Sequence, residues 1–414
     1  MTETPRLDWS DFPTVVFTIV TRNHFHFAAA LADNVQQHSP DCLFVAVIAD
    51  MDATTAPTEA SGQSTWFHPQ HGDWAACEGQ IHNNRIVLSG QSVCQESWER
   101  FAFQYSAFEL TCALKSQAGT WLLEQGITKL VYLDADVRLY QPAELLLQEV
   151  TDGGLLLTPH LRSRLPDDGR YPDNVDLLRT GNFNAGIWAV CSTRETHHEV
   201  MKVMHWWRAC CFHQCIVDPH DGLFVDQKWL DQAVSISSRV IVSRNPGINV
   251  GYWNLHEYRP ESEPLVAFHF SGADGRELRL SSHQNRHLVT RGSWLESLLN
   301  DYSQGNQLQF PDYYQALDYR YETLVDGQEI EPAWREVIRS NTADQWDLID
   351  NPFEHFANDI GHERLHKYAE QLKQGRFHWQ QAQLHQRIQT LRRKLDRQPL
   401  RRLLKFVKDR MRRA

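Results

Sequence analysis

Short apolar runs alternate with helical segments through the first two thirds of the chain, and this alternation limits the possible folds most strongly. The first runs cover residues 13–20, 43–49 and 129–133, with helical spacing at 26–37 and 108–124 between them. Strands that are apolar on both sides need helices on both faces of their sheet. The pattern therefore predicts an α/β fold with a mostly parallel sheet flanked by helices. Further short apolar runs lie at 154–158, 183–190 and 265–270.

The character of the sequence changes near residue 306. Aromatic, acidic and Gln-rich helical segments follow, and strand-like runs are no longer evident. We predict a main domain over residues 1–305, a helical extension over 306–375 and a basic helical tail over 376–414. Residues 51–91 have weak periodicity, and we predict an irregular excursion there.

The charge is unevenly distributed. The 414 residues carry a formal net charge of −11, yet residues 387–414 hold twelve Lys/Arg against two Asp. Residues 400–413 place apolar side chains on one helical face and cations on the other, which is typical of a helix lying on an anionic membrane surface. A short coiled coil over 376–397 and a solvated helix packed on the acidic body are the alternatives. The tail lacks the interleaved aromatic residues of a nucleic-acid module, so we expect no nucleic-acid partner.

The cysteines and the apolar runs indicate the compartment. Eight cysteines at irregular spacings predict reduced thiols rather than a disulfide framework. The N-terminus lacks the features of a secretory signal, and no apolar run approaches the roughly 20 residues of a membrane helix. We expect a cytoplasmic protein, with a peripheral position on the inner face of the plasma membrane as an extension. Residues 210–215 (Cys-Cys-Phe-His-Gln-Cys) contain possible zinc ligands, but no second pair of ligands follows at the spacing of a zinc site. We therefore expect no metal there.

Asp134-Ala135-Asp136 closes the apolar run at 129–133. In an extended segment residues i and i+2 point to the same side, so both carboxylates can face one ligand. Ligands of open α/β sheets gather at the carboxyl ends of the strands, and paired carboxylates there suit Mg²⁺ or Mn²⁺. The alternative is an ordinary acidic junction between strand and loop.

Other polar motifs follow in order along the chain. They contain amide, carboxylate, imidazole or small residues suited to hydroxyl-rich and pyrophosphate ligands: Gly181-Asn182-Phe183-Asn184-Ala185-Gly186, Val225-Asp226-Gln227, Asn249-Val250-Gly251-Tyr252-Trp253-Asn254, and Phe268-His269-Phe270-Ser271-Gly272. His269 ends an apolar run and is placed to complete a metal site, although a single histidine at a strand end is more often structural.

Together these motifs resemble bacterial glycosyltransferases of the GT-A fold, in the branch related to glycosyltransferase family 8. The resemblance spans residues 17–286 and includes Thr21-Arg22-Asn23 after the first strand. It implies a GT-A fold and a metal-dependent, retaining transfer of a sugar from a nucleotide-diphosphate donor, most directly a UDP-sugar, to a hydroxyl of a glycan or lipid-linked acceptor. It also implies a place in bacterial surface glycan or glycoconjugate synthesis.

The resemblance assigns roles to individual residues. The metal ligands, for Mn²⁺ or Mg²⁺, would be Asp134, Asp136 and His269. Contacts to the nucleotide sugar would come from Thr21, Arg22, Asn23, Asp50, Asp134, Ala135, Ser271 and Gly272. The catalytic group would comprise Asp226, Gln227, Asn184 and Lys115. The family's Lys-Pro-Trp after His-Phe-Ser-Gly is absent, so Lys115, Arg22 and Arg286 are the candidate cations for the leaving diphosphate.

Two other functions are compatible with parts of the pattern. Haloacid dehalogenase-like phosphatases also carry Asp-x-Asp after an apolar strand, but normally on the first strand, and the residues after Val137 do not match. A sugar-binding or scaffold protein without activity would keep the fold. Asp226 as a general base would give inversion, so the sequence leaves the stereochemistry open.

Overall fold

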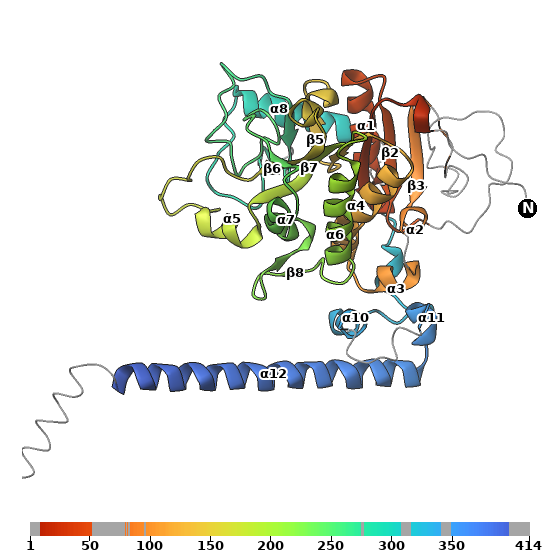
Figure 1. Cartoon of the computed structure of the whole chain (residues 1–414), viewed down its shortest axis with the longest axis vertical. Helices are drawn as coiled ribbons and strands as arrows, with labels where there is room; N and C mark the ends of the chain where they lie inside the picture. Colours follow the sequence, from red (N-terminus) through yellow and green to blue (C-terminus); the bar gives the residue numbers. More distant parts are fainter. Residues whose placement is uncertain are drawn as a thin grey trace, which may run out of the picture. The chain divides into compact units, whose positions relative to one another are not determined.

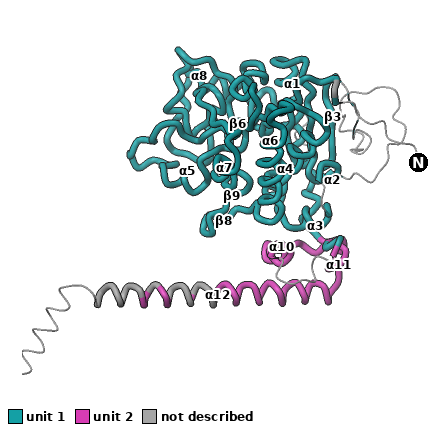
Figure 2. The backbone as a smooth tube through the Cα atoms, in the orientation of Figure 1, with its two compact units in different colours: residues 1–323, 350–352 teal, residues 324–349, 353–414 magenta. Residues whose placement is uncertain are grey.

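The computed structural model describes residues 9–51, 79, 81, 83–94, 97–274, 277–307, 316–340 and 349–396. The chain divides into two compact units, Met1–Thr323 with Asp350–Pro352, and Leu324–Ile349 with Phe353–Ala414 (Figure 2). The basic segment 400–413 lies outside the described residues, as does most of the excursion expected over 51–91.

The strands are β1 (Val15–Val20), β2 (Leu43–Ile48), β3 (Arg85–Ser89), β4 (Lys129–Leu133), β5 (Val137–Leu139), β6 (Gly154–Pro159), β7 (Phe183–Cys191), β8 (Val217–Asp218), β9 (Leu223–Phe224), β10 (Val240–Val242) and β11 (Ala267–His269). The α-helices are α1 (Phe25–His38), α2 (Gly90–Val93), α3 (Trp98–Phe103), α4 (Ala107–Glu124), α5 (Asn174–Thr180), α6 (His197–Cys211), α7 (Val225–Ile236), α8 (Trp294–Gln307), α10 (Pro332–Arg339), α11 (Pro352–His355) and α12 (Asp359–Asp396). Short 3₁₀ segments are η1 (Trp9–Asp11), η2 (Arg22–His24), η5 (Ala143–Val150) and η6 (Arg320–Glu322).

Seven of the described strands form the central sheet, in the order β10-β6-β7-β4-β1-β2-β3. Figure 1 labels β6, β7, β2 and β3 of this sheet. Neighbours pair in parallel except at β7, which runs antiparallel to both β4 and β6. The predicted α/β architecture with a mostly parallel sheet is therefore confirmed. Because β7 is reversed, its first residues reach the same edge as the last residues of β4 and β6.

Side chains of the central strands alternate between two helical layers. Val131 and Leu133 of β4 belong to an apolar cluster that includes α1 and η5. Tyr132, between them, faces the other side, where its ring stacks on Trp188 at 5.5 Å. Trp188 in turn meets Trp207 of α6 edge-on at 5.4 Å, on the side where α4, α6 and α7 pack together. This alternation directs Asp134, two residues after Tyr132, toward α4.

One prediction about the strands was wrong. Residues 85–89 form the edge strand β3 rather than part of an irregular excursion. This strand is short and has polar flanks, so its period is weak in the sequence. The strand predicted at 265–270 is confirmed as β11, which pairs with β5 in a small sheet separate from the central one.

The second unit is helical, as expected for the C-terminal extension. Residues 376–396 of the predicted polar helix lie within α12, which begins earlier, at Asp359. Trp334 of α10 stacks on His362 of α12 at 5.7 Å, and Arg376 pairs with Glu336 at 2.7 Å. None of the helices in the described residues combines the length and apolar character that crossing a membrane requires. The cysteines of the described residues are free: Cys42, Cys94, Cys112, Cys191, Cys210, Cys211 and Cys215.

Candidate active site

The two aspartates lie on a turn that joins β4 to β5. The Val137 backbone N–H closes this turn by donating to the Asp134 carbonyl at 2.9 Å. The sequence predicted that alternation along an extended strand would bring the carboxylates of Asp134 and Asp136 together. In the structure a turn brings them together instead. The chain leaves the central sheet at Leu133, so the turn stands at the carboxyl edge of the sheet.

His269 reaches the turn from the small sheet. It is directly opposite Val137 in the antiparallel pairing of β11 with β5, and the Phe270 N–H donates to the Asp136 carbonyl at 2.9 Å. The His269 Nε2 atom lies 3.0 Å from Asp136 Oδ1 and 3.8 Å from Asp134 Oδ2. The prediction that His269 meets the two aspartates therefore agrees with their placement in the structure.

These residues fit a divalent cation. One ligand atom from each of Asp134, Asp136 and His269 lies within 4.8 Å of the other two. Burial disfavours a positive charge on His269, but the Asp136 and Asp134 carboxylates outweigh burial and raise the pKa of the imidazole. Burial likewise disfavours charge on Asp136, and His269 outweighs it and lowers the pKa of that carboxyl. Two carboxylate oxygens and one imidazole nitrogen form a donor set suited to Mn²⁺ or Mg²⁺.

Lys115 of α4 links the aspartate turn to the start of α7. Its ammonium lies 2.9 Å from Asp134 Oδ1 and 3.8 Å from Asp226 Oδ2, and it donates to the Ala185 carbonyl at 3.4 Å. The same ammonium stands 5.0 Å from the centre of the Tyr132 ring. Burial alone would lower the pKa of Lys115, but the two carboxylates raise it well above its usual value. Lys115 is thus a buried, permanently charged cation.

Asp226 lies in the first turn of α7, directly after a strained residue. Val225 has φ +41°, a conformation that β-branched residues rarely adopt. The Asp226 side chain is enclosed, and burial raises its pKa to about 6 although Lys115 opposes the shift. Gln227 follows and donates from Nε2 to the Thr180 carbonyl at 2.8 Å.

A β-bulge shapes the start of β7. Leu157 of β6 pairs with Trp188, but the next residue, Thr158, pairs with Asn184. The residues between, 185–187, bulge out of the ladder, which re-aims the strand at this point. Asn184, the residue directly before the bulge, is half-buried.

Gly186 occupies the centre of the bulge and lies against Asp134 and His269. Its carbonyl accepts from the Asp134 N–H at 2.8 Å, and its own N–H donates to Asn184 Oδ1 at 2.9 Å. A Cβ atom at this position would lie 2.2 Å from His269 Cε1 and 2.7 Å from Asp134 Oδ2. The absence of a side chain here lets the two ligands approach each other.

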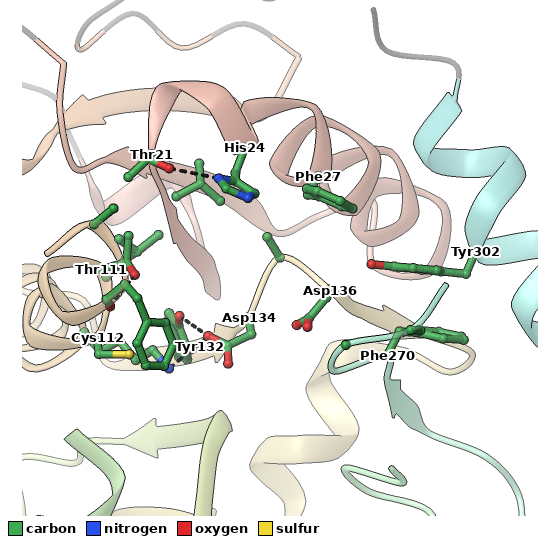
Figure 3. Close-up of a pocket in the computed structure, with 18 residues that line it drawn as sticks. Thr21, His24, Phe27, Thr111, Cys112, Tyr132, Asp134, Asp136, Phe270 and Tyr302 are labelled. Carbon is green, nitrogen blue, oxygen red and sulfur yellow. Dashed lines mark hydrogen bonds and ion pairs between the residues drawn. The ribbon is translucent and has the colours of Figure 1, made fainter. Parts of the chain in front are cut away.

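A cavity of about 550 Å³ opens beside the aspartate turn (Figure 3). It is lined by Ile19, Val20, Thr21, His24, Phe27, Ala107, Phe108, Thr111, Cys112, Lys115, Tyr132, Asp134, Ala135, Asp136, Phe270, Gly272, Ala273 and Tyr302. Figure 3 shows Thr21, His24 and Phe27 along one wall and the two carboxylates across from them. The cavity thus combines aromatic surface with carboxylates and one buried cation.

Several residues predicted to bind the nucleotide sugar do not line this cavity. The Asp50 carboxylate is enclosed, and it accepts from the Arg22 backbone N–H at 2.7 Å and from Arg22 Nε at 3.3 Å. Asn23 accepts from Thr21 Oγ1 at 2.5 Å. Ser271 is also absent from the lining among the described residues.

Arg286, a candidate partner for the leaving diphosphate, is bound elsewhere. Its guanidinium pairs with Asp168 at 2.9 Å and donates to the carbonyls of Arg170 and Pro172. Arg286 therefore holds the loop before α5. The three proposed cations are Lys115, Arg22 and Arg286. Among the described residues that line the cavity, Lys115 is the only one of these three.

The structure also adds residues that the motifs did not indicate. Tyr132 donates to Asp134 Oδ1 at 2.5 Å, and His24 and Phe27 line the cavity. Tyr132 could have been found from its position two residues before Asp134, on the same side of β4. His24 and Phe27 carried no comparable signal, because they lie at the N-cap and in the first turn of an otherwise ordinary apolar helix, α1.

Comparisons with known proteins come from sequence and from structure. No protein-family model matches the chain. The uncharacterized protein YfnF of Bacillus subtilis (strain 168) is 24% identical over 159 residues, which is 35% of this chain and 50% of YfnF. The chain therefore matches about half the length of that curated relative.

Solved structures with a similar course of the chain are glycosyltransferases. One is the galactosyltransferase LgtC in complex with donor and acceptor sugar analogs, with 14% identity over 72% of this chain and 96% of LgtC, at a TM-score of 0.41. Another is GlyE of Streptococcus pneumoniae TIGR4, with 12% identity over 76% and 67% of the two chains, at 0.37. Mouse xyloside xylosyltransferase 1 shares 9% identity over 62% of this chain and 97% of its own, at 0.36.

Proposed function

We propose that this protein is a metal-dependent glycosyltransferase that moves a sugar from a nucleotide-diphosphate donor to an acceptor hydroxyl. The observation that carries the proposal is the convergence of Asp134, Asp136 and His269 beside a cavity of about 550 Å³. Pockets of roughly 300–1,000 Å³ are of the size that binds small molecules and cofactors. A group of two carboxylates and an imidazole at its edge is suited to a cation that neutralises a diphosphate.

The wall residues support a division of the cavity. Thr21, His24 and Phe27 supply a hydroxyl, an imidazole and an aromatic face, which suit a nucleoside. We assign the diphosphate to the end beside Asp134 and Asp136, where a bound Mn²⁺ or Mg²⁺ would stabilise the charge on the leaving group. UDP-sugars are the donor class that we would test first.

Lys115 and Asp226 support a retaining transfer. Asp226 is enclosed and already faces the Lys115 ammonium, so we assign it to positioning the sugar and stabilising positive charge on it. A general base must reach the acceptor hydroxyl within about 3 Å. A carboxylate more exposed than that of Asp226 would suit that task better, so we do not assign Asp226 as the base. Our candidates for contacts to the donor sugar are Asn184, at the bulge, and Gln227, which follows Asp226.

Hydrolysis of UDP-sugars tests the function. The wild-type chain should release UDP from at least one member of a UDP-sugar panel, and release should require Mn²⁺ or Mg²⁺. Asp136→Ala should reduce this activity at least 100-fold, because it removes one of the ligands (about 2.7 kcal/mol of transition-state stabilisation). Asp218→Ala is the control, since Asp218 belongs to a separate group with His220 and Asp221. An Asp136→Ala variant as active as wild type would refute the metal role.

We further propose that residues 400–413 bring the enzyme to an anionic membrane surface and thereby to a lipid-linked acceptor. The support is the sequence pattern of an apolar face opposite a cationic one. The free cysteines agree with a reducing, cytoplasmic compartment. Flotation with vesicles containing anionic lipid should capture the full chain and not a chain ending at residue 399. Equal flotation of the two would refute the membrane role.

A further inference from the structure

Asn249 lies behind His269, on the side away from the aspartates. It is fully enclosed in the segment between β10 and β11. Its Oδ1 atom lies 3.2 Å from His269 Nδ1, while His269 Nε2 lies 3.0 Å from Asp136 Oδ1. The two imidazole nitrogens therefore have different partners, an amide on one side and the carboxylates on the other.

The orientation of the Asn249 amide is fixed by its other neighbours. Nδ2 donates to Thr158 Oγ1 at 2.6 Å and to Asn184 Oδ1 at 3.1 Å. Asn184 Oδ1 can only accept, and it also accepts from the Gly186 N–H at 2.9 Å. The Thr158 hydroxyl donates to the Ile187 carbonyl at 2.8 Å, which leaves its oxygen to accept from Asn249. Both acceptors thus require the NH₂ group of Asn249 on their side.

The position of the NH₂ group determines the role of the opposite atom. Asn249 Oδ1 faces His269 and can only accept, so Nδ1 of the imidazole must carry the hydrogen. A neutral imidazole protonated at Nδ1 has its lone pair at Nε2, which is the atom that faces Asp134 and Asp136. A lone pair at Nε2 is what a metal ligand requires.

We propose that Asn249 is a positioning residue that holds His269 in the orientation and tautomer needed to bind a divalent cation. The inference rests on the proposed metal site and extends it to a residue outside the ligand set. Through its hydrogen bonds to Thr158 and Asn184, Asn249 connects His269 to the β-bulge in β7. The hydrogen bonds among Asn249, Thr158 and Asn184 therefore hold the His269 ring. They also hold the start of β7, where Gly186 leaves space for that ring.

The backbone around Asn249 is consistent with this role. Asn249 has φ +56°, in the left-handed region that asparagine tolerates better than most residues. Asn254 holds this conformation, because its Nδ2 donates to the Asn249 carbonyl at 3.0 Å and its Oδ1 accepts from the Gly251 N–H at 2.9 Å. Trp253 packs edge-on against the His269 ring at 5.2 Å.

Asn249→Gly tests the proposal with little strain on the fold. Glycine adopts a left-handed conformation freely, so the variant removes the amide while keeping the backbone. Mn²⁺ affinity, measured from the EPR signal of free Mn²⁺, should weaken 10–100-fold, as is typical when the hydrogen-bond partner of a ligand histidine is lost. The melting temperature without metal monitors the fold.

Asn84→Gly is a matched control. Asn84 is also left-handed, with φ +57°, and its Nδ2 donates to the Pro40 carbonyl at 3.0 Å. This residue precedes β3, and it is absent from the cavity lining and from the metal group in the described residues. Asn84→Gly should bind Mn²⁺ as the wild type does.

Asn249→Asp tests the specific contribution of the acceptor. Aspartate keeps an oxygen facing His269 Nδ1, but it cannot donate to Thr158 Oγ1 and Asn184 Oδ1 as the amide does. The melting temperature without metal accounts for that loss, and the Mn²⁺ affinity of the folded variant should stay within tenfold of wild type and above that of Asn249→Gly. The proposal is overturned if Asn249→Gly binds Mn²⁺ as tightly as wild type, or if Asn249→Asp loses as much affinity as Asn249→Gly.

The same titrations separate this inference from the proposed function. A wild-type chain that does not bind Mn²⁺ would refute the metal site, and the role of Asn249 would fall with it. Wild-type binding that Asp136→Ala abolishes and Asn249→Gly leaves unchanged would refute the role of Asn249 alone.

Discussion

At the scale of single residues, Lys115 is a buried cation shared by two carboxylates of the site. It lies 2.9 Å from Asp134 and 3.8 Å from Asp226. The closer contact is to Asp134, and Asp226 Oδ2 has no hydrogen-bond partner in the described residues. Burial therefore dominates Asp226 and raises its pKa to about 6.

This raised pKa predicts how stability depends on pH. Between about pH 4 and pH 6 the folded chain binds the Asp226 proton more tightly than the unfolded chain does. The contribution of Asp226 to the free energy of unfolding should fall by about 3 kcal/mol as pH rises through that window, and then level off. Asp226→Asn should lack this contribution.

Urea unfolding of both chains from pH 4 to pH 8, without divalent cations, measures the effect. The free energy of unfolding of the wild type minus that of Asp226→Asn should decline between pH 4 and pH 6. A difference that stays flat would show that Asp226 ionises at an ordinary pKa.

The sequence predicted residues whose chemistry is apparent from their type and order. Asp134, Asp136 and His269 meet as expected, and Lys115 lines the cavity. The role of Asp50 stays a prediction. A carboxylate after a strand can face a ligand or a neighbouring arginine, and in the structure Asp50 pairs with Arg22 at 3.3 Å.

At the scale of elements, the bulge in β7 connects the sheet to the site. It moves residues 185–187 out of the ladder with β6, so that the Gly186 carbonyl accepts from the Asp134 N–H at 2.8 Å. The bulge thus fixes the backbone of the aspartate turn. It also places a residue without a side chain against His269.

Gly186→Ala should therefore weaken Mn²⁺ binding at least tenfold. The added methyl group would lie 2.2 Å from His269 Cε1 and 2.7 Å from Asp134 Oδ2, so at least one ligand must move. Gly305→Ala is the control, because a Cβ there meets no atom within 4 Å. Isothermal titration with Mn²⁺ measures both variants, and unchanged affinity in Gly186→Ala would show that the ligands can shift without loss.

Elements with a strong apolar period were predictable, and short ones were not. The runs of β1, β2 and β4 are continuous and buried over most of their length. β5 and β10 have three residues each, too few for a period to show, and they form because neighbouring strands offer partners. The turn after β4 could not be foreseen, since Asp-Ala-Asp is compatible with both a turn and a strand.

At the scale of the whole molecule, every residue assigned to the site lies in the first compact unit. The segment that ends this unit contacts the first βα connection, where Arg22 donates from Nη2 to the Asp318 carbonyl at 2.9 Å. Trp98 donates to Tyr321 Oη at 2.8 Å. Residues 316–323 are thus part of the unit that holds the site.

A chain ending at Thr323 should bind Mn²⁺ and UDP with the affinity of the full chain, within about threefold. A chain ending at Gln307 lacks the contacts of Asp318 and Tyr321 and should melt at a lower temperature. Thermal shift with UDP and Mn²⁺ compares the three chains. Loss of binding in the chain ending at Thr323 would show that residues beyond Thr323, which include Asp350–Pro352 of the first unit, contribute to the site.

The reversed direction of β7 brings both ends of the β6–β7 connection to one edge of the sheet. The excursion over residues 160–182 leaves the sheet where β6 ends and returns where β7 begins, and both points are at the edge that carries Asp134 and Asp136. Arg286 anchors this excursion from outside the sheet by pairing with Asp168. Under the proposed function, exchanging the excursion for one of another length would reshape the approach to the donor sugar while leaving the strand register and the positions of Asp134, Asp136 and His269 unchanged.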